Sequence, residues 1–163
     1  MMRGIRMLLA SLAVLLVIIF LFSLLFSSTA KMQRAGVIQA PAVAVFDHLQ
    51  DTAAWKYWYP WPVSRDPAHG KLVIDKVVKD SLILYRVLST DERLNINGSI
   101  YLTQTSPTAT TINWSMERHV GVLPWWKLRG LLMDKLYGPA MEKGLSDLKK
   151  LAEGQLTDTS MAR

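Results

Sequence analysis

The chain has 163 residues, a formal net charge of +6, three histidines and no cysteine. The lack of cysteine excludes a disulfide framework and a thiolate metal site, and His48, His69 and His119 are too far apart for a metal-binding motif. The basic excess is modest and contains no long basic run, which favours a nearby anionic lipid surface over nucleic acid as the partner.

The first feature along the chain is a run without a charged side chain, from Met7 to Phe26. A helix needs about 20 apolar residues to cross a hydrocarbon core about 30 Å thick. A buried core helix of this length would normally carry a polar face. We therefore predict an N-terminal membrane anchor, preceded and followed by short polar stretches, over residues 1–30.

The charges around this run do not decide its orientation, because Arg3 and Arg6 precede it while Lys31 and Arg34 follow it. The order of basic, apolar and small residues is nevertheless that of an export signal. The run exceeds the roughly 7–15 apolar residues of a cleaved signal, so we expect an uncleaved anchor, with a signal peptide as the alternative. The expected protein is single-pass, with its domain on the extracytoplasmic (periplasmic) side.

The next segments read as one strand and two short helices. Alternation predicts a strand over Met32–Gln39, and the spacing of apolar residues after Pro41 predicts a helix over Ala42–Leu49. Trp55 and Trp58 lie three residues apart, on one side of a second helix. That helix should end before Pro60, which disfavours helical geometry in the preceding residue.

Two alternating segments, 72–78 and 82–88, predict paired strands. In the second segment, Arg86 shares a face with leucines while Tyr85 shares the other face with aliphatic residues. Both faces of this strand are therefore expected to be at least half-buried.

Asn97-Gly98 resembles a hairpin turn, but a two-residue loop there would pair apolar with polar residues on both faces. We predict instead one long strand from about Glu92 to Gln104, with Gly98 as a bend or a point of close approach. The following strand should direct Ile112, Trp114 and Met116 to its inner face.

The last element is a helix, because apolar residues recur at a period near 3.6 from Met133 to Ala152. Pro139 should kink or break this helix, and Gly144 lies on its apolar face. The order of elements predicts an α+β domain over residues 31–154, with a helix laid across one antiparallel sheet. Residues 155–163 are polar and aperiodic, which predicts a flexible tail.

Three stretches carry a family resemblance: VIQAPAVAVFDHLQD from Val37, WKYWYPW from Trp55 with Arg65-Asp66-Pro67 behind it, and PWWKLRGLLMDKLYGPAMEKGLSDLKKL from Pro124. Over the whole domain the chain resembles the SRPBCC family, the START-like or polyketide cyclase/dehydrase superfamily of helix-grip folds. The resemblance implies a curved antiparallel sheet around the C-terminal helix, with an apolar cavity between them. It also implies binding of lipids or other hydrophobic small molecules in many relatives, and catalysis in only some. The segment after Asp66-Pro67 is shorter than in relatives of this type, which suggests a smaller sheet and a smaller or more open cavity.

If the chain has this fold, the candidate ligand-binding residues are those on the strand and helix faces that are expected to line the cavity. A buried guanidinium needs a carboxylate or phosphate partner, so Arg86 in the cavity would indicate an anionic headgroup; a solvated Arg86 is the alternative. The candidate ligand-binding residues are Trp58, Trp61, Tyr85, Arg86, Tyr101, Trp114, Met141 and Gly144.

A second candidate surface lies at the start of the last helix. Trp125 and Trp126 are adjacent, so they cannot easily both point inward, and Lys127 and Arg129 follow them. Tryptophan together with basic residues is typical of the membrane–water interface. We predict that these four residues contact the membrane, with core packing of the tryptophans as the alternative.

No catalytic constellation, cofactor motif or metal motif is present in the sequence. Asp66 could act as a general acid facing the cavity, although an Asp-Pro pair more often begins a turn. The leading hypothesis is a membrane-tethered binding protein for a lipid or other hydrophobic small molecule. The alternatives are a cyclase- or dehydratase-like enzyme that uses the same cavity and a structural subunit of a membrane complex.

Overall fold

The structure, a computed structural model, describes residues 2–25, 27–62, 70–91, 95–121 and 123–154. The elements in chain order are α1 (Met2–Ser23), β1 (Thr29–Ile38), α2 (Ala42–Gln50), α3 (Trp55–Trp58), β2 (Lys71–Val78), β3 (Leu82–Leu88), β4 (Ile96–Ser106), β5 (Ala109–His119) and α4 (Pro124–Ala152). Residues 155–163, predicted to be a tail, lie outside the described residues.

The α1 helix extends away from the rest of the molecule, and its apolar side chains are exposed. Its segment from Gly4 to Ser23 is long and apolar enough to cross a membrane, and none of it is buried against the domain. The predicted N-terminal apolar helix is therefore present.

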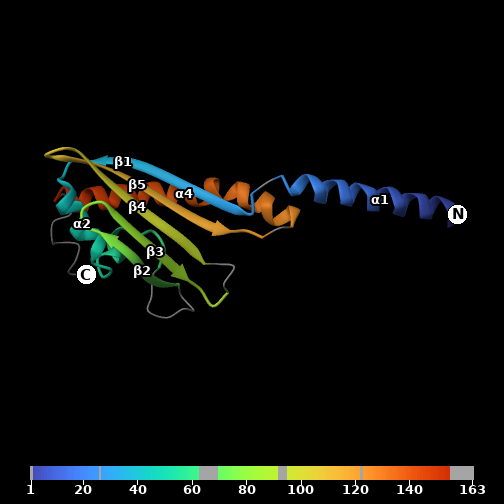
Figure 1. Cartoon of the computed structure of the whole chain (residues 1–163), viewed down its shortest axis with the longest axis horizontal. Helices are drawn as coiled ribbons and strands as arrows, with labels where there is room; N and C mark the ends of the chain where they lie inside the picture. Colours follow the sequence, from blue (N-terminus) through green and yellow to red (C-terminus); the bar gives the residue numbers. More distant parts are fainter. Residues whose placement is uncertain (1, 26, 63–69, 92–94, 122, 155–163) are drawn as a thin grey trace.

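The five described strands form one antiparallel sheet in the order β1-β5-β4-β3-β2. The long helix α4 lies across one face of the sheet, mainly against β1, while α2 and α3 lie at the end remote from α1 (Figure 1). This is the α+β helix-grip layout predicted from the sequence.

No hairpin forms at Asn97-Gly98, because β4 runs straight through both residues. Gly98 lies between Tyr85 on β3 and Met116 on β5. A Cβ atom at Gly98 would overlap the ring of Tyr85, which lies across the glycine. The glycine thus lets an aromatic side chain lie flat on the sheet. The predicted close approach at Gly98 is confirmed.

The hydrophobic core lies between the inner face of the sheet and α4. The strands contribute side chains at alternate positions, as a sheet with one covered face requires. The helix contributes residues on one side at the predicted helical spacing. The buried apolar residues of α4 are Met133, Met141, Leu145, Leu148 and Leu151.

Of the two outcomes expected at Pro139, a kink or a break, the break does not occur, because α4 continues through the proline. Proline lacks the N–H that would bond to the carbonyl four residues earlier, so the helix is weakened there. The guanidinium of Arg34 on β1 lies over the adjacent Gly138, where a Cβ atom would overlap it. It donates to Asp134 at 2.9 Å and to Glu142 at 2.8 Å, which raises the pKa of Arg34. Arg34 therefore bridges the helical turns on both sides of the proline.

The α4 helix approaches the backbone at the end of α3 closely at Gly144. A Cβ atom at this position would lie 2.9 Å from the carbonyl oxygen of Trp58, 3.0 Å from Pro60 Cδ and 3.2 Å from Trp114 Cζ3. A backbone carbonyl cannot rotate away as a flexible side chain can. Gly144 therefore sets the distance between α4, the α3 segment and β5.

The first prediction concerns this contact. Gly144→Ala should lower the free energy of unfolding by about 1–3 kcal/mol, the usual range for overpacking. Helix propensity alone predicts the opposite, a gain of about 1 kcal/mol. The measurement is denaturant unfolding of the full chain in detergent micelles, with Lys135→Ala at an exposed position of α4 as the control. An alanine variant as stable as the parent or more stable would contradict the close approach.

Candidate functional site

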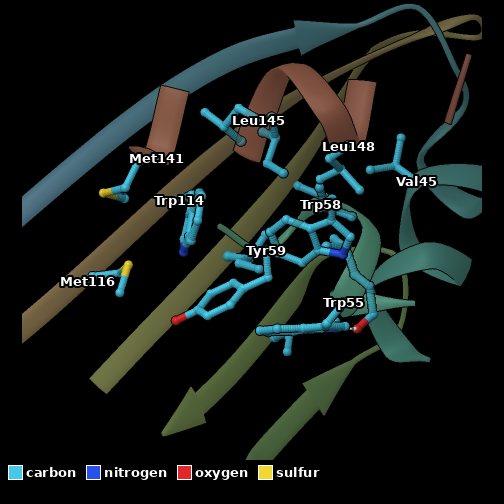
Figure 2. Packing of buried hydrophobic residues seen from close by; sticks show 14 of the residues in the cluster. Val45, Trp55, Trp58, Tyr59, Trp114, Met116, Met141, Leu145 and Leu148 are labelled. Atoms are coloured by element: carbon cyan, nitrogen blue, oxygen red, sulfur yellow. Dashed lines mark hydrogen bonds between the residues drawn. The ribbon is translucent and has the colours of Figure 1, made fainter. Parts of the chain in front are cut away.

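Six aromatic side chains form a cluster between the sheet and α4. They come from α3 and the segment after it, from β3 and from β5, and their neighbouring ring centroids lie 4.8–6.1 Å apart. Figure 2 shows the labelled members below α4, with Met116 and Met141 at one end and Val45 and Leu148 at the other. The aromatic cluster consists of Trp55, Trp58, Tyr59, Trp61, Tyr85 and Trp114.

Hydrogen bonds fix the orientation of these rings. The indole N–H of Trp114 donates to the Tyr85 hydroxyl at 2.7 Å, and that hydroxyl is also hydrogen-bonded to Tyr59. The indole N–H of Trp55 donates to the carbonyl of Leu49 at 2.8 Å. Burial raises the pKa of both Tyr59 and Tyr85, so both phenols stay protonated and remain hydrogen-bond donors. Among the described residues, the buried indole N–H of Trp58 has no acceptor.

Most of the predicted ligand-binding residues lie in this interior. Trp58, Tyr85, Trp114 and Met141 are each at most 1% exposed, and Gly144 is buried beside them. Trp61 is half-buried, and its ring centroid lies 6.0 Å from that of Tyr137 on α4. In the described part of the chain, these side chains pack on one another.

Two predicted ligand-binding residues lie elsewhere. Arg86 is exposed on the outer face of β3 and binds Asp75 with two bonds of 2.7 Å, which lowers the pKa of Asp75. Tyr101 is 50% exposed on β4. Neither side chain faces α4. Side chains alternate along a strand, and each of these two residues follows a residue whose side chain does face α4. The solvated alternative for Arg86 is the correct one, and we leave both residues out of the candidate site.

The structure contains a groove between the edge strand β1 and α4, with a volume of about 270 Å³. Its apolar lining includes Ile38, Ile112 and Leu145, all of which are at least nine-tenths buried. Arg34, Glu142, Ser146 and Lys149 also line it, and they give it a polar rim of mixed charge.

The groove was not predicted from the sequence, although two signals for it exist there. Arg34 and Gly36 share the strand period of Met32 and Ile38, and so belong to the face that contacts α4. A Cβ atom at Gly36 would meet only Ile112 Cγ2, at 3.9 Å, so the missing side chain leaves open space. A charged residue and a glycine on an otherwise apolar strand face therefore marked the groove.

The predicted membrane-contact residues divide into two kinds. Trp125 and Trp126 are 61% and 38% exposed at the start of α4. Lys127 is buried, against the prediction, and its ammonium donates to the carbonyl of Ser23 at 2.7 Å. A cation at a helix C-terminus interacts favourably with its free carbonyls and its dipole. Lys127 thus joins the start of α4 to the end of α1, and the side chain of Arg129 lies outside the described residues.

The described hydrophobic core contains no carboxylate or imidazole. Within the described ranges, the buried polar or charged residues are Ser23, Thr110 and Lys127, together with Tyr59 and Tyr85 of the aromatic cluster. The side chain of Glu153, beside the end of α4, is 9% exposed. Those ranges also hold no cluster of three potential metal ligands. Asp66 and His69 lie outside the described residues.

Comparison with protein-family models found no match, and comparison with the curated protein sequences found none either. Solved structures do match. A START superfamily protein from Mycobacterium smegmatis is 16% identical, with a TM-score of 0.55, over 77% of this chain and 96% of that one. The Zhui aromatase/cyclase from Streptomyces sp. R1128 is 13% identical, with a TM-score of 0.53, over 80% of this chain and 97% of that one.

A third match is the di-domain ARO/CYC protein BexL from the BE-7585A biosynthetic pathway. It is 15% identical, with a TM-score of 0.56, over 76% of this chain, and this chain spans 46% of its length. At these identities the likeness establishes the fold. The chain has the SRPBCC or START-like helix-grip fold that its sequence resembles.

The second prediction tests the hydrogen bonds of the aromatic cluster. Tyr85→Phe should destabilise the domain by about 1–3 kcal/mol, because it leaves the buried N–H of Trp114 without an acceptor. Tyr101→Phe, which removes an exposed hydroxyl, is the matched control and should leave the stability unchanged. The free energy of unfolding of each variant gives the answer, and an equal effect of the two changes would contradict the buried network.

Proposed function

We propose that this chain, a START-like domain carried on one hydrophobic helix, binds a lipid or other hydrophobic small molecule between its sheet and α4 at a membrane surface. The observation that carries this proposal is the groove between β1 and α4, with apolar side chains within it and charged groups at its rim. Binding sites for small molecules have this character, with mostly apolar walls and a few polar groups that orient the ligand.

The size of the groove limits the ligand. Sites for drug-sized molecules usually measure about 300–1,000 Å³, and the groove, at about 270 Å³, lies just below that range. It therefore suits one small apolar molecule or part of one acyl chain better than a complete two-chain lipid. Arg34 is already paired with two carboxylates, so the rim does not favour an anionic headgroup over a neutral one.

The interior residues would extend this site if the aromatic cluster opened. Trp58, Tyr85, Trp114, Met141 and Gly144 are buried, and the half-buried ring of Trp61 packs against Trp114 and against Tyr137. A ligand would reach them by separating Trp61 from Tyr137 on α4. The two rings are held together only by their packing. Protonated tyrosines would then offer hydrogen bonds to an uncharged acceptor such as a carbonyl.

A position at the membrane completes the proposal. The α1 helix would span the bilayer with the domain on the extracytoplasmic side, and Trp125 and Trp126 would lie in the interface, with Arg129 near lipid headgroups. The contact between Lys127 and Ser23 supports this arrangement, because it brings the start of α4 to the end of the span. Hydrophobic ligands could then exchange directly with the bilayer.

Binding is favoured over catalysis by the residues that the interior contains. A cyclase- or dehydratase-like enzyme needs an acid or base beside its substrate. The aromatic cluster contains two buried tyrosines and no carboxylate or imidazole. Asp66 is the residue whose substitution tests the enzyme hypothesis. If Asp66→Asn abolished a reaction in a folded protein, the enzyme hypothesis would replace the binding-protein hypothesis.

The third prediction locates the ligand. The full chain in lipid nanodiscs is exposed to a fatty acid that carries a photoreactive diazirine, and the labelled peptides are mapped by mass spectrometry. We expect labelling of the β1 segment 34–38 and the α4 segment 142–149, in addition to α1. Labelling of α1 by probe dissolved in the bilayer serves as the internal reference.

Gly36→Phe is the blocking variant, because the open space at Gly36 accepts a side chain without strain and the ring would fill the groove. It should reduce labelling of the β1 and α4 segments at least tenfold and leave α1 labelling unchanged. Gln33→Phe, on the exposed side of the same strand, is the matched control. Labelling confined to α1 in the parent, or equal groove labelling in the two variants, would contradict the proposal.

A further inference from the structure

Lys127 is a charged residue that the protein buries beside an apolar helix. It is 6% exposed, and its ammonium donates to the carbonyl of Ser23 at 2.7 Å. Burial of an ammonium costs free energy unless strong hydrogen-bond acceptors surround it. The free carbonyls at the C-terminus of a helix are such acceptors, and they carry the negative end of the helix dipole. Lys127 therefore acts as a side-chain cap at the end of α1.

The neighbouring carbonyls at the end of α1 also have donors within the protein. Those of Leu21 and Phe22 accept hydrogen bonds of 3.1 Å from the N–H groups of Leu24 and Leu25. Together with the Lys127 bond, this gives each of the last three carbonyls of α1 a protein donor. A helix that ends in water can leave these carbonyls to the solvent, whereas a helix that ends in hydrocarbon cannot. The bonding of this end suits a position inside a membrane.

The surface around this end of α1 is apolar. Leu24 and Leu25, which follow the helix, are 55% and 78% exposed, and Trp125 in the first turn of α4 is 61% exposed. Polar side chains begin only at Ser27. Figure 1 shows α1 ending beside the start of α4. The apolar surface of α1 thus continues past Ser23 and onto the start of α4.

With α1 spanning the bilayer, as proposed above, its length places Ser23 below the outer boundary of the hydrocarbon core. Arg6 is charged and belongs outside the core at the opposite surface, so the apolar part of the helix begins at Met7. At 1.5 Å per residue, the stretch from Met7 to Ser23 is about 26 Å long. A hydrocarbon core is about 30 Å thick, so about 4 Å of it remains beyond Ser23. Leu24, Leu25 and the first turn of α4 lie at this depth.

We infer that the first turn of α4 enters the outer leaflet together with α1, and that Lys127 supplies the donor that closes α1 within the hydrocarbon. This arrangement rests on the proposed membrane span and adds a second inserted segment to it. The partner of the surface around Trp125 is then the acyl chains of the outer leaflet. Ionisable side chains within a membrane are rare, and they face the protein interior and pair with one another or with backbone carbonyls. Lys127 is thus a positioning residue that fixes the domain relative to the span.

Fluorescence quenching measures the depth of the first turn of α4. The chain has no native cysteine, so Leu25→Cys, Trp125→Cys and Lys76→Cys on β2 can each carry a single bimane label at an exposed position of the full chain. The proteins are inserted into phosphatidylcholine vesicles with a nitroxide either high on the acyl chain or on the headgroup. The acyl-chain nitroxide should quench the labels at positions 25 and 125 several-fold more than the headgroup nitroxide does. Neither nitroxide should quench the label at position 76.

The outcomes that contradict this arrangement are separable from failure of the span. Suppose that the label at position 25 is quenched from the acyl chain, while the label at position 125 is quenched mainly from the headgroup or as little as the label at position 76. The α1 helix then spans the membrane but α4 does not enter it, and the inference is wrong. Release of the parent chain from membranes by alkaline carbonate would instead overturn the proposed span, and the inference with it.

A pair of substitutions tests the role of Lys127. Spin labels at Leu16→Cys on α1 and Lys135→Cys on α4, both exposed, report the distance between the two helices of the full chain in lipid nanodiscs. The parent should give one narrow distance distribution. Lys127→Met keeps a side chain of similar length without a donor and should at least double the width of the distribution, whereas Lys127→Arg keeps a donor and should leave it narrow. A narrow distribution in Lys127→Met, or equal broadening in both variants, would show that the donor does not hold the helices together.

Discussion

The close approach of α4 at Gly144 is the constraint on which the other features depend. The helix backbone is held against the Trp58 carbonyl and the Trp114 ring, so the aromatic cluster packs closely beneath α4, with the Trp114 indole hydrogen-bonded to Tyr85. The same contact fixes α4 at a set distance from β1, and the space left between them is the groove. A larger residue at this position would lift the helix, loosen the cluster and change the groove together.

The helix that closes the domain also contacts the hydrophobic helix α1. Beyond Arg34, which bridges the turns around Pro139, the first half of α4 extends to Lys127 and its hydrogen bond to the end of α1. The α4 helix thus runs from the groove to the end of α1. In the proposed function this coupling holds the groove close to the bilayer, where hydrophobic molecules are concentrated.

Periodicity was sufficient to predict most of the fold. The alternation in β4 outweighed the local turn signal of Asn97-Gly98, because a covered sheet face imposes a stronger requirement than a dipeptide. The site was harder to predict. Arg86 and Lys127 were assigned from their neighbours in the sequence, whereas their partners, Asp75 and Ser23, come from pairings that a single sequence does not reveal. The groove depends on a missing side chain, at Gly36. The sequence carried a signal for it, a charged residue and a glycine on an otherwise apolar strand face, but the distance between β1 and α4 that makes the space a groove comes from tertiary packing.

The central claim is that the domain stands on the outer side of a membrane, with the start of α4 at the interface. Its most direct test is thiol labelling of intact bacterial spheroplasts with a membrane-impermeant reagent, using Lys76→Cys and Trp125→Cys in the full chain. The account predicts rapid labelling of Lys76→Cys and at least tenfold slower labelling of Trp125→Cys, which the interface shields. Labelling of Lys76→Cys only after lysis would place the domain in the cytosol. Equal labelling rates at the two positions would show that the start of α4 does not lie at the membrane surface.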